Sequence, residues 1–166
     1  GGQKREPSTG AVMPPVFMTS TYAHTTPGEA QEFEYSRGGN PTRTALENSF
    51  AAIENGTHGF AFSSGMAAID CVLRTLSPGD EIVTGDDLYG GTYRMFTKLF
   101  QKYGLEFIFV DSSKVVSVVE AITDKTKLVW LETPTNPLMK IAVIEGICTA
   151  VKEVNPAILI AVDNTF

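Results

Sequence analysis

The sequence has few cysteines, no excess of positive charge and no long apolar run, and each absence excludes a class of protein. Its two cysteines, Cys71 and Cys148, lie in apolar helical patterns, so no Cys-x-x-Cys motif and no disulfide framework is present. Thirteen basic against nineteen acidic residues give a net charge of −6, which disfavours nucleic acid or an anionic membrane as partner. No apolar run approaches the ~18 residues that a membrane span needs, and the N-terminus lacks a signal-type apolar core. We therefore expect a reduced, cytoplasmic protein with no metal site, no nucleic acid and no membrane.

What is present suits a globular α/β chain. Its 166 residues, 43% of them hydrophobic, fit about one domain with a buried core. Apolar periodicity and turn signals predict helices over 41–54, 66–73, 90–103, 115–122 and 143–154, and strands over 60–62, 81–84, 105–110, 127–132 and 157–163. The apolar runs at 128–131 and 158–162 are typical of strands buried on both faces. This order predicts a three-layer α/β/α fold, with helices on both faces of a mostly parallel sheet.

Residues 1–41 differ from the rest of the chain. They show no sustained period and are rich in proline, yet they hold apolar side chains such as Val12, Phe17 and Phe33. That is too much hydrophobicity for a disordered tail. We interpret 1–41 as an extended arm that lies on a surface, either of its own domain or of a second subunit. Residues 42–166 then form the main domain.

The turn Ser63-Ser64-Gly65 has the composition of a phosphate site. It lies between the expected strand at 60–62 and the expected helix at 66–73. The start of a helix has unpaired amides and the positive end of the macrodipole, and a glycine there lets an anion come close. The turn therefore predicts an anion site at the Gly65 and Met66 amides. The alternative is an ordinary serine-capped helix.

Asp163 is the most informative single residue. It ends a strand of consecutive aliphatic residues, where an unpaired carboxylate is too costly to keep ionised, so it needs a cationic partner. One alternative is that it caps a helix or pairs with a distant arginine. The other is a ligand with a protonated ring nitrogen. With a phosphate site near Gly65 and with Tyr89 available to stack, the residues predict a site for a flat, phosphorylated heterocycle.

Five motifs together resemble one enzyme family. They are Tyr35-Ser36-Arg37-Gly38-Gly39-Asn40-Pro41-Thr42-Arg43, Gly59-Phe60-Ala61-Phe62-Ser63-Ser64-Gly65-Met66, Asp87-Leu88-Tyr89-Gly90-Gly91-Thr92, Glu132-Thr133-Pro134-Thr135-Asn136-Pro137 and Asp163-Asn164-Thr165-Phe166. Their order and spacing are similar to those of the pyridoxal-phosphate enzymes of cysteine and methionine metabolism, the trans-sulfuration enzymes. The resemblance implies an aspartate-aminotransferase-like large domain of fold type I, and pyridoxal 5'-phosphate as cofactor.

The resemblance also implies a role for each site residue. Gly65 and Met66 would bind the cofactor phosphate, Asp163 the pyridine nitrogen, and Asn136 would lie beside the phenolic oxygen. Tyr89 would stack on the ring and act in catalysis. The residues that match Tyr35 and Arg37 reach the phosphate of a neighbouring subunit in this family, which implies a homodimer, usually doubled into a homotetramer.

One departure from the family pattern concerns lysine. The family holds its cofactor through a lysine that follows the Asp-Asn-Thr-Phe motif, and none of the eight lysines of this chain has that context. The carboxylate-binding arginine of the family's C-terminal domain has no match either. We therefore expect 42–166 to be the N-terminal part of the large domain of a longer enzyme. The non-enzyme alternative is an inactive paralogue that binds pyridoxal phosphate.

Glu34 and Gly91 bear on the substrate. Glu34 precedes the Tyr35-Ser36-Arg37 motif, and family members that handle cystathionine typically carry an acidic residue there, suited to the distal ammonium of that substrate. Methionine γ-lyases typically carry cysteine at the position of Gly91. The resemblance implies γ-elimination of L-cystathionine to cysteine, 2-oxobutanoate and ammonia, with Glu34 and Tyr35 contacting the substrate. The alternatives are γ-replacement on an O-acylhomoserine and γ-elimination of methionine.

Overall fold

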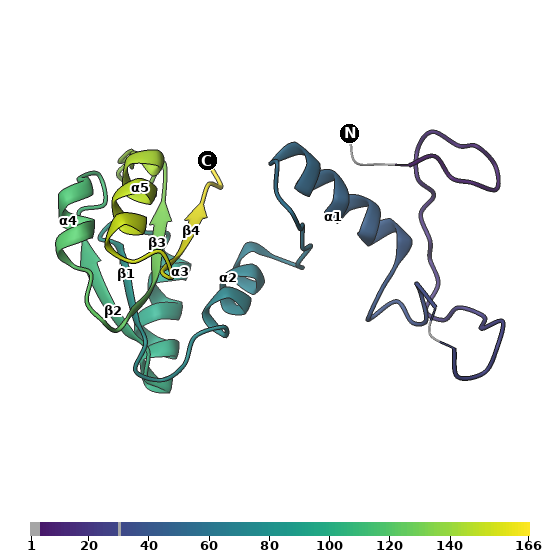
Figure 1. Cartoon of the computed structure of the whole chain (residues 1–166), viewed down its shortest axis with the longest axis horizontal. Coiled ribbons are helices and arrows are strands. Elements are labelled where there is room, and N and C mark those ends of the chain that lie inside the picture. The colour runs from purple at the N-terminus through teal and green to yellow at the C-terminus, as the bar shows by residue number, and fades with distance from the viewer. Residues whose placement is uncertain (1–3, 30) are drawn as a thin grey trace. The chain divides into compact units, whose positions relative to one another are not determined.

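The computed structural model describes residues 4–29 and 31–166, which fall into two units (Figure 1). The first unit covers Gly1–Ser63 and the second Ser64–Phe166. Residues 1–3 and 30 of the expected arm lie outside the described residues. The division between these two units falls after Ser63, so the first unit contains the first helix as well as the expected arm, and the expected boundary at residue 41 stays a prediction.

The first unit combines an extended chain with one helix, α1 (Pro41–Ile53). Asn40 caps α1 by accepting the Thr42 amide, and Pro41 occupies the first turn, where its missing N–H costs nothing. The Asn40 side chain also donates to the carbonyl of Phe17, and Thr21 forms an isolated bridge with Tyr35. The cap of the helix thus fixes the extended chain as well.

The second unit alternates strands and helices, as the sequence predicts (Figure 1). Its elements are α2 (Gly65–Leu73), β1 (Glu81–Gly85), α3 (Gly90–Arg94), η1 (Met95–Leu99), η2 (Phe100–Tyr103), β2 (Glu106–Val110), α4 (Val115–Glu120), β3 (Thr126–Glu132), α5 (Ile144–Val154) and β4 (Leu159–Asp163). The four strands pair in parallel in the order β2-β1-β3-β4. The predicted mostly parallel α/β sheet is confirmed.

Alternating side chains build one core on each face of the sheet. Leu128 and Trp130 of β3 pack with α2 and the α3–η2 segment, whereas Val129 and Leu131 pack with α4 and α5. Because both faces are covered, the strand is apolar throughout its central residues 128–131. The cores fix the sheet, and so fix where the carboxyl ends of its strands lie.

One expectation about elements was wrong, and one expected helix is present but irregular. Residues 60–62 form no strand: Phe60 is exposed, and the Ala61 amide donates to the Glu47 side chain instead of to a neighbouring strand. The helix expected over 90–103 is continuous but irregular, since its α-helical start passes into π and then 3-10 geometry before Gly104 ends it with φ 87°. Apolar spacing predicts that a helix is present, but it does not distinguish these tighter and wider turns.

Candidate functional site

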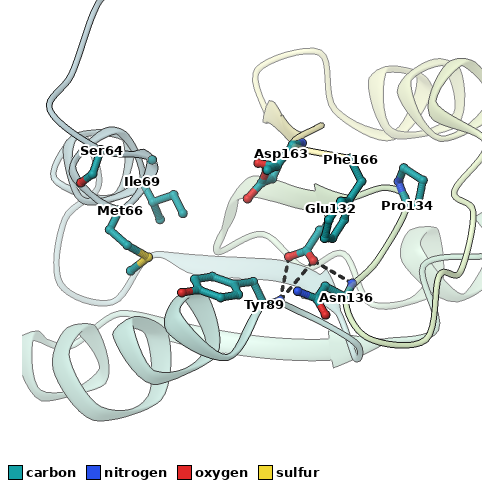
Figure 2. Close-up of a pocket in the computed structure, with 11 residues that line it drawn as sticks. Ser64, Met66, Ile69, Tyr89, Glu132, Pro134, Asn136, Asp163 and Phe166 are labelled. Atoms are coloured by element: carbon teal, nitrogen blue, oxygen red, sulfur yellow. Dashed lines mark hydrogen bonds between the residues drawn. The ribbon is translucent and has the colours of Figure 1, made fainter.

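A cavity of about 340 Å³ lies at the carboxyl ends of the strands of the second unit (Figure 2). Its volume falls in the range of small-molecule sites. The lining residues are Ser64, Gly65, Met66, Ile69, Tyr89, Glu132, Pro134, Asn136, Asp163, Thr165 and Phe166. Five of the expected cofactor residues therefore meet in one cavity, although 98 positions separate the first from the last in the sequence.

The N-terminus of α2 forms one wall of the cavity. Ser64 caps the helix by accepting the Ala67 amide at 3.2 Å. The preceding amides, of Gly65 and Met66, have no acceptor within the described part of the chain, as expected for the first turn of a helix. Nothing lies within 4 Å of the place where a Cβ of Gly65 would be, so an anion has room to approach. The serine cap is therefore present, and it leaves the Gly65 and Met66 amides open for the predicted anion.

Asp163 ends β4 at another wall of the same cavity. Its carboxylate accepts from the Thr165 hydroxyl at 2.6 Å and from the Thr165 amide at 3.3 Å. No lysine or arginine pairs with it among residues 4–29 and 31–166. The alternatives of an arginine partner and of a helix cap therefore find no support in the described residues. A negative group without a cation at a cavity wall suits a cationic ligand atom.

Tyr89 and Met66 bring an aromatic ring and a thioether to the cavity (Figure 2). Tyr89 precedes α3, and its side chain is about half exposed. A Cβ at Gly91 would meet the Tyr89 ring and would come within 3.1 Å of the Met66 sulfur. Because glycine has no Cβ, Gly91 leaves room for both the Tyr89 ring and the Met66 side chain.

Glu132 is a site residue for which the sequence analysis proposed no role. It ends β3, is 4% exposed, and accepts from the Tyr89 amide and the Asn136 amide, each at 2.9 Å (Figure 2). Burial raises the pKa of the Glu132 carboxyl, and the charges of Asp163 and Asp87 act in the same direction, against the two backbone hydrogen bonds. The signal was available in the sequence, since Glu132 ends an apolar strand just as Asp163 does.

The loop after β3 is held by a second acidic residue, Asp87. The buried Asp87 carboxylate accepts from the Thr135 hydroxyl and, at 3.0 Å, from the Leu138 amide. Lys140 follows the loop and bonds Asp86 at 2.8 Å, and this contact raises the pKa of the Lys140 amine. Lys140 is thus paired with Asp86, and it is not among the residues that line the cavity.

The other expected site residues, Glu34, Tyr35 and Arg37, lie together in the first unit. They line a shallow hollow with Gln31, Glu32, Gly38 and Gly39. Tyr35 is 43% exposed, and the Arg37 guanidinium lies 5.0 Å from the centre of the Tyr35 ring. These side chains are available to a ligand or to another chain.

Comparison with known proteins decides the family. The family model for Cys/Met metabolism PLP-dependent enzymes matches residues 1–166. The chain belongs to this family. Members of the Cys/Met metabolism family are pyridoxal-phosphate-dependent, which agrees with the cofactor expected from the resemblance.

Several curated members of the family are similar to almost all of this chain. It is 50% identical over 166 residues to a cystathionine beta-lyase of Coxiella burnetii, covering 99% of this chain and 42% of that protein. It is 46% identical to the cystathionine gamma-lyase of Bacillus subtilis, covering 100% and 43%. It is also 46% identical to a probable cystathionine gamma-synthase of Herpetosiphon aurantiacus, covering 99% and 51%.

A solved structure of the family supports the fold. The crystal structure of cystathionine gamma-lyase from Lactobacillus plantarum superposes with a TM-score of 0.92 at 43% identity, over 99% of this chain and 42% of that one. The chain thus has the fold expected from the resemblance, in an incomplete fold type I domain. It spans about half or less of the length of these relatives. No helix in the described part of the chain is long and apolar enough to cross a membrane.

Proposed function

We propose that the cavity of the second unit holds pyridoxal 5'-phosphate. The free amides of Gly65 and Met66 suit its phosphate, and the Asp163 carboxylate suits a protonated ring nitrogen. Tyr89 would contact the ring face, and Asn136 would lie beside the phenolic oxygen. The observation on which this rests is that one cavity combines helix N-terminal amides and a carboxylate for which the described residues supply neither an acceptor nor a cation.

We further propose that the whole enzyme cleaves L-cystathionine by γ-elimination to cysteine, 2-oxobutanoate and ammonia. Bound pyridoxal phosphate supplies an electron sink for the negative charge that develops at substrate carbon. Asp163 keeps the ring nitrogen protonated, which maintains that sink. Tyr89, at the cavity wall, is the group of this chain placed to move a proton when the γ-substituent leaves.

A β-elimination is a second candidate, which the sequence analysis did not consider. The relative named above that is 50% identical to this chain is a cystathionine beta-lyase. Cleavage on that side of the sulfur gives homocysteine and pyruvate in place of cysteine and 2-oxobutanoate. The synthase reaction on an O-acylhomoserine is a third candidate, favoured by the gamma-synthase relative.

We also propose that the enzyme is cytoplasmic and works as a homodimer or homotetramer with a shared active site. The exposed Tyr35 and Arg37 would bind the phosphate in a neighbouring subunit, with Glu34 and Tyr35 near the substrate. An arginine fork suits a phosphate well, because it makes two parallel charge-assisted hydrogen bonds. The large apolar side chains that the first unit exposes, such as Met18 and Phe50, are consistent with such a contact.

Product analysis on the full-length enzyme tests the reaction. With L-cystathionine and pyridoxal phosphate, we expect cysteine and 2-oxobutanoate in equal amounts, identified by mass spectrometry. If the products were homocysteine and pyruvate instead, the reaction would be β-elimination and not γ-elimination. Formation of cystathionine from cysteine and an O-acylhomoserine, without cleavage, would establish the synthase reaction instead.

Substitution of Asp163 tests the cofactor site. Asp163→Asn keeps an oxygen for Thr165 but loses the charge, so we expect kcat/KM to fall by about ten- to hundredfold, with little change in Tm. Thr165→Val is the matched control, because it alters the same contact and leaves the carboxylate in place. If Asp163→Asn and Thr165→Val lowered kcat/KM equally, the assignment of Asp163 to the ring nitrogen would be wrong.

A further inference from the structure

Glu132 is a buried carboxylate without a cationic partner in the described part of the chain. Within residues 4–29 and 31–166, its hydrogen bonds go to backbone amides alone. Oε2 accepts the Tyr89 amide at 2.9 Å, and Oε1 accepts the Asn136 amide at 2.9 Å and the Tyr89 amide at 3.1 Å. Hydrogen bonds to an ionised acceptor are about twice as strong as neutral ones.

The two amides belong to segments that are distant in the sequence. Tyr89 lies between β1 and α3, and Asn136 lies in the loop after β3. Figure 2 shows both bonds meeting at the one carboxylate, while the side chains of Tyr89 and Asn136 line the cavity. Glu132 therefore fixes the backbone from which two walls of the cavity project.

The position of Glu132 is costly in electrostatic terms. In the register of the sheet, Glu132 of β3 pairs with Asp163 of β4, so two carboxylates end adjacent strands. Burial and the charges of Asp163 and Asp87 all raise the pKa of the Glu132 carboxyl. The hydrogen bonds to the two loops are the contacts of Glu132 that offset this cost.

We propose that Glu132 is a positioning residue that holds Tyr89 and Asn136 in place against the ring of the bound cofactor. This inference rests on the proposed function, since it takes the cavity to be the pyridoxal phosphate site. It assigns Glu132 no contact with the reacting atoms. Its effect on the reaction passes through the placement of Tyr89 and Asn136.

The test uses full-length enzyme from which the cofactor has been removed, and pyridoxal phosphate as the probe. Affinity is measured by equilibrium dialysis, and visible circular dichroism at saturation reports how the ring is held. Glu132→Gln keeps an oxygen that can accept at the Oε1 position but loses the charge and the Oε2 bond. We expect the affinity for pyridoxal phosphate to fall about tenfold in Glu132→Gln and about a hundredfold in Glu132→Ala. The dichroic band at saturation should change in both.

Glu81→Gln is the matched control. Glu81 is 5% exposed and begins β1, at the amino-terminal ends of the parallel strands, whereas the cavity lies at their carboxyl ends. Its carboxylate accepts from the hydroxyls of Thr123 and Thr126. It is also a buried, hydrogen-bonded strand carboxylate, but it does not line the cavity. We expect Glu81→Gln to alter Tm without changing the affinity or the dichroic band.

The possible outcomes separate the inference about Glu132 from the proposed cofactor site. Wild-type affinity and dichroism in Glu132→Gln would overturn the inference while leaving the proposed cofactor site intact. Equal losses in Glu132→Gln and Glu81→Gln would also overturn it, because they would indicate general destabilisation. If Glu132→Ala does not fold, Glu132→Gln alone decides. Failure of the wild-type protein itself to bind pyridoxal phosphate would overturn the proposed function, and this inference with it.

Discussion

Gly91 has no room for a side chain while Tyr89 and Met66 keep their places. A Cβ there would come within 3.0 Å of Cδ1 of the Tyr89 ring and 3.1 Å of the Met66 sulfur. We expect Gly91→Ala in the full-length enzyme to displace the Tyr89 ring and to weaken pyridoxal phosphate binding by about tenfold, since overpacking typically costs about 1–3 kcal/mol. Equilibrium dialysis measures this.

Gly90→Ala is the control for Gly91→Ala. At Gly90 the nearest atom to an added Cβ is the tip of the flexible Arg94 side chain, at 3.3 Å, which can move aside. We expect Gly90→Ala to bind pyridoxal phosphate nearly as the wild type does. Equal losses in the two variants would mean that helix α3, and not the place of the Tyr89 ring, is what the substitutions disturb.

Glu34 is the residue that we propose to recognise the distal amine of the substrate. It is exposed and lines the hollow that also contains Tyr35 and Arg37, so its carboxylate is available to a distal ammonium group. We expect Glu34→Gln to lower kcat/KM for cystathionine about ten- to hundredfold more than for a substrate without a distal amine, if that contact is desolvated in the assembled site. Parallel assays of both substrates on the full-length enzyme measure the difference. Equal falls would show that Glu34 does not distinguish them.

At the scale of the elements, the apolar pattern of the sequence predicts regular helices and strands. Irregular segments depend on local contacts that this pattern does not show. Strand β3 is predictable because burial on both faces demands an unbroken apolar run, which residues 128–131 supply. Residues 60–62 carry a similar short run, but the segment lies along α1 and bonds the Glu47 side chain. A three-residue apolar run does not reveal whether a neighbouring strand is present.

The contact between this segment and α1 makes Gly59 critical. A Cβ at Gly59 would overlap the backbone carbonyl of Glu47 and lie 3.2 Å from its Cα, and no side-chain rotation can relieve a clash with backbone. We expect Gly59→Ala to destabilise this contact by about 1–3 kcal/mol. Faster hydrogen exchange of the α1 amides in the full-length protein would measure it.

Gly38→Ala is the comparison for Gly59→Ala. Gly38 lies in the same unit, and a Cβ there would be in ordinary contact, 3.5 Å from the Tyr35 carbonyl oxygen. We expect exchange of the α1 amides to stay at the wild-type rate in Gly38→Ala. Unchanged exchange in Gly59→Ala would contradict the close approach of the segment to α1.

At the scale of the whole molecule, the sequence predicts which residues gather at the candidate site better than it predicts how they are held. Tyr89, Asn136 and Asp163 are predictable because parallel strands bring their carboxyl ends to one edge of the sheet, and Gly65 because it begins the helix α2. The hydrogen bonds by which Glu132 holds the Tyr89 and Asn136 amides are not predictable from the sequence, because they depend on how two loops orient their backbone N–H groups. The expected contact of residues 1–41 with a neighbouring subunit stays a prediction.

The proposed enzyme needs a lysine to hold its cofactor. Among residues 4–29 and 31–166, no lysine lines the cavity, and Lys140 is bound to Asp86. We therefore expect a polypeptide limited to residues 1–166 to show no turnover of cystathionine with added pyridoxal phosphate. In such a polypeptide β4 would also be an edge strand, with Leu159 54% exposed, which favours aggregation. The measurement is 2-oxobutanoate release, run beside full-length enzyme at equal concentration. Turnover that persists after removal of any full-length contaminant would mean that the residues described here suffice for catalysis, and the proposed need for a further lysine would be wrong.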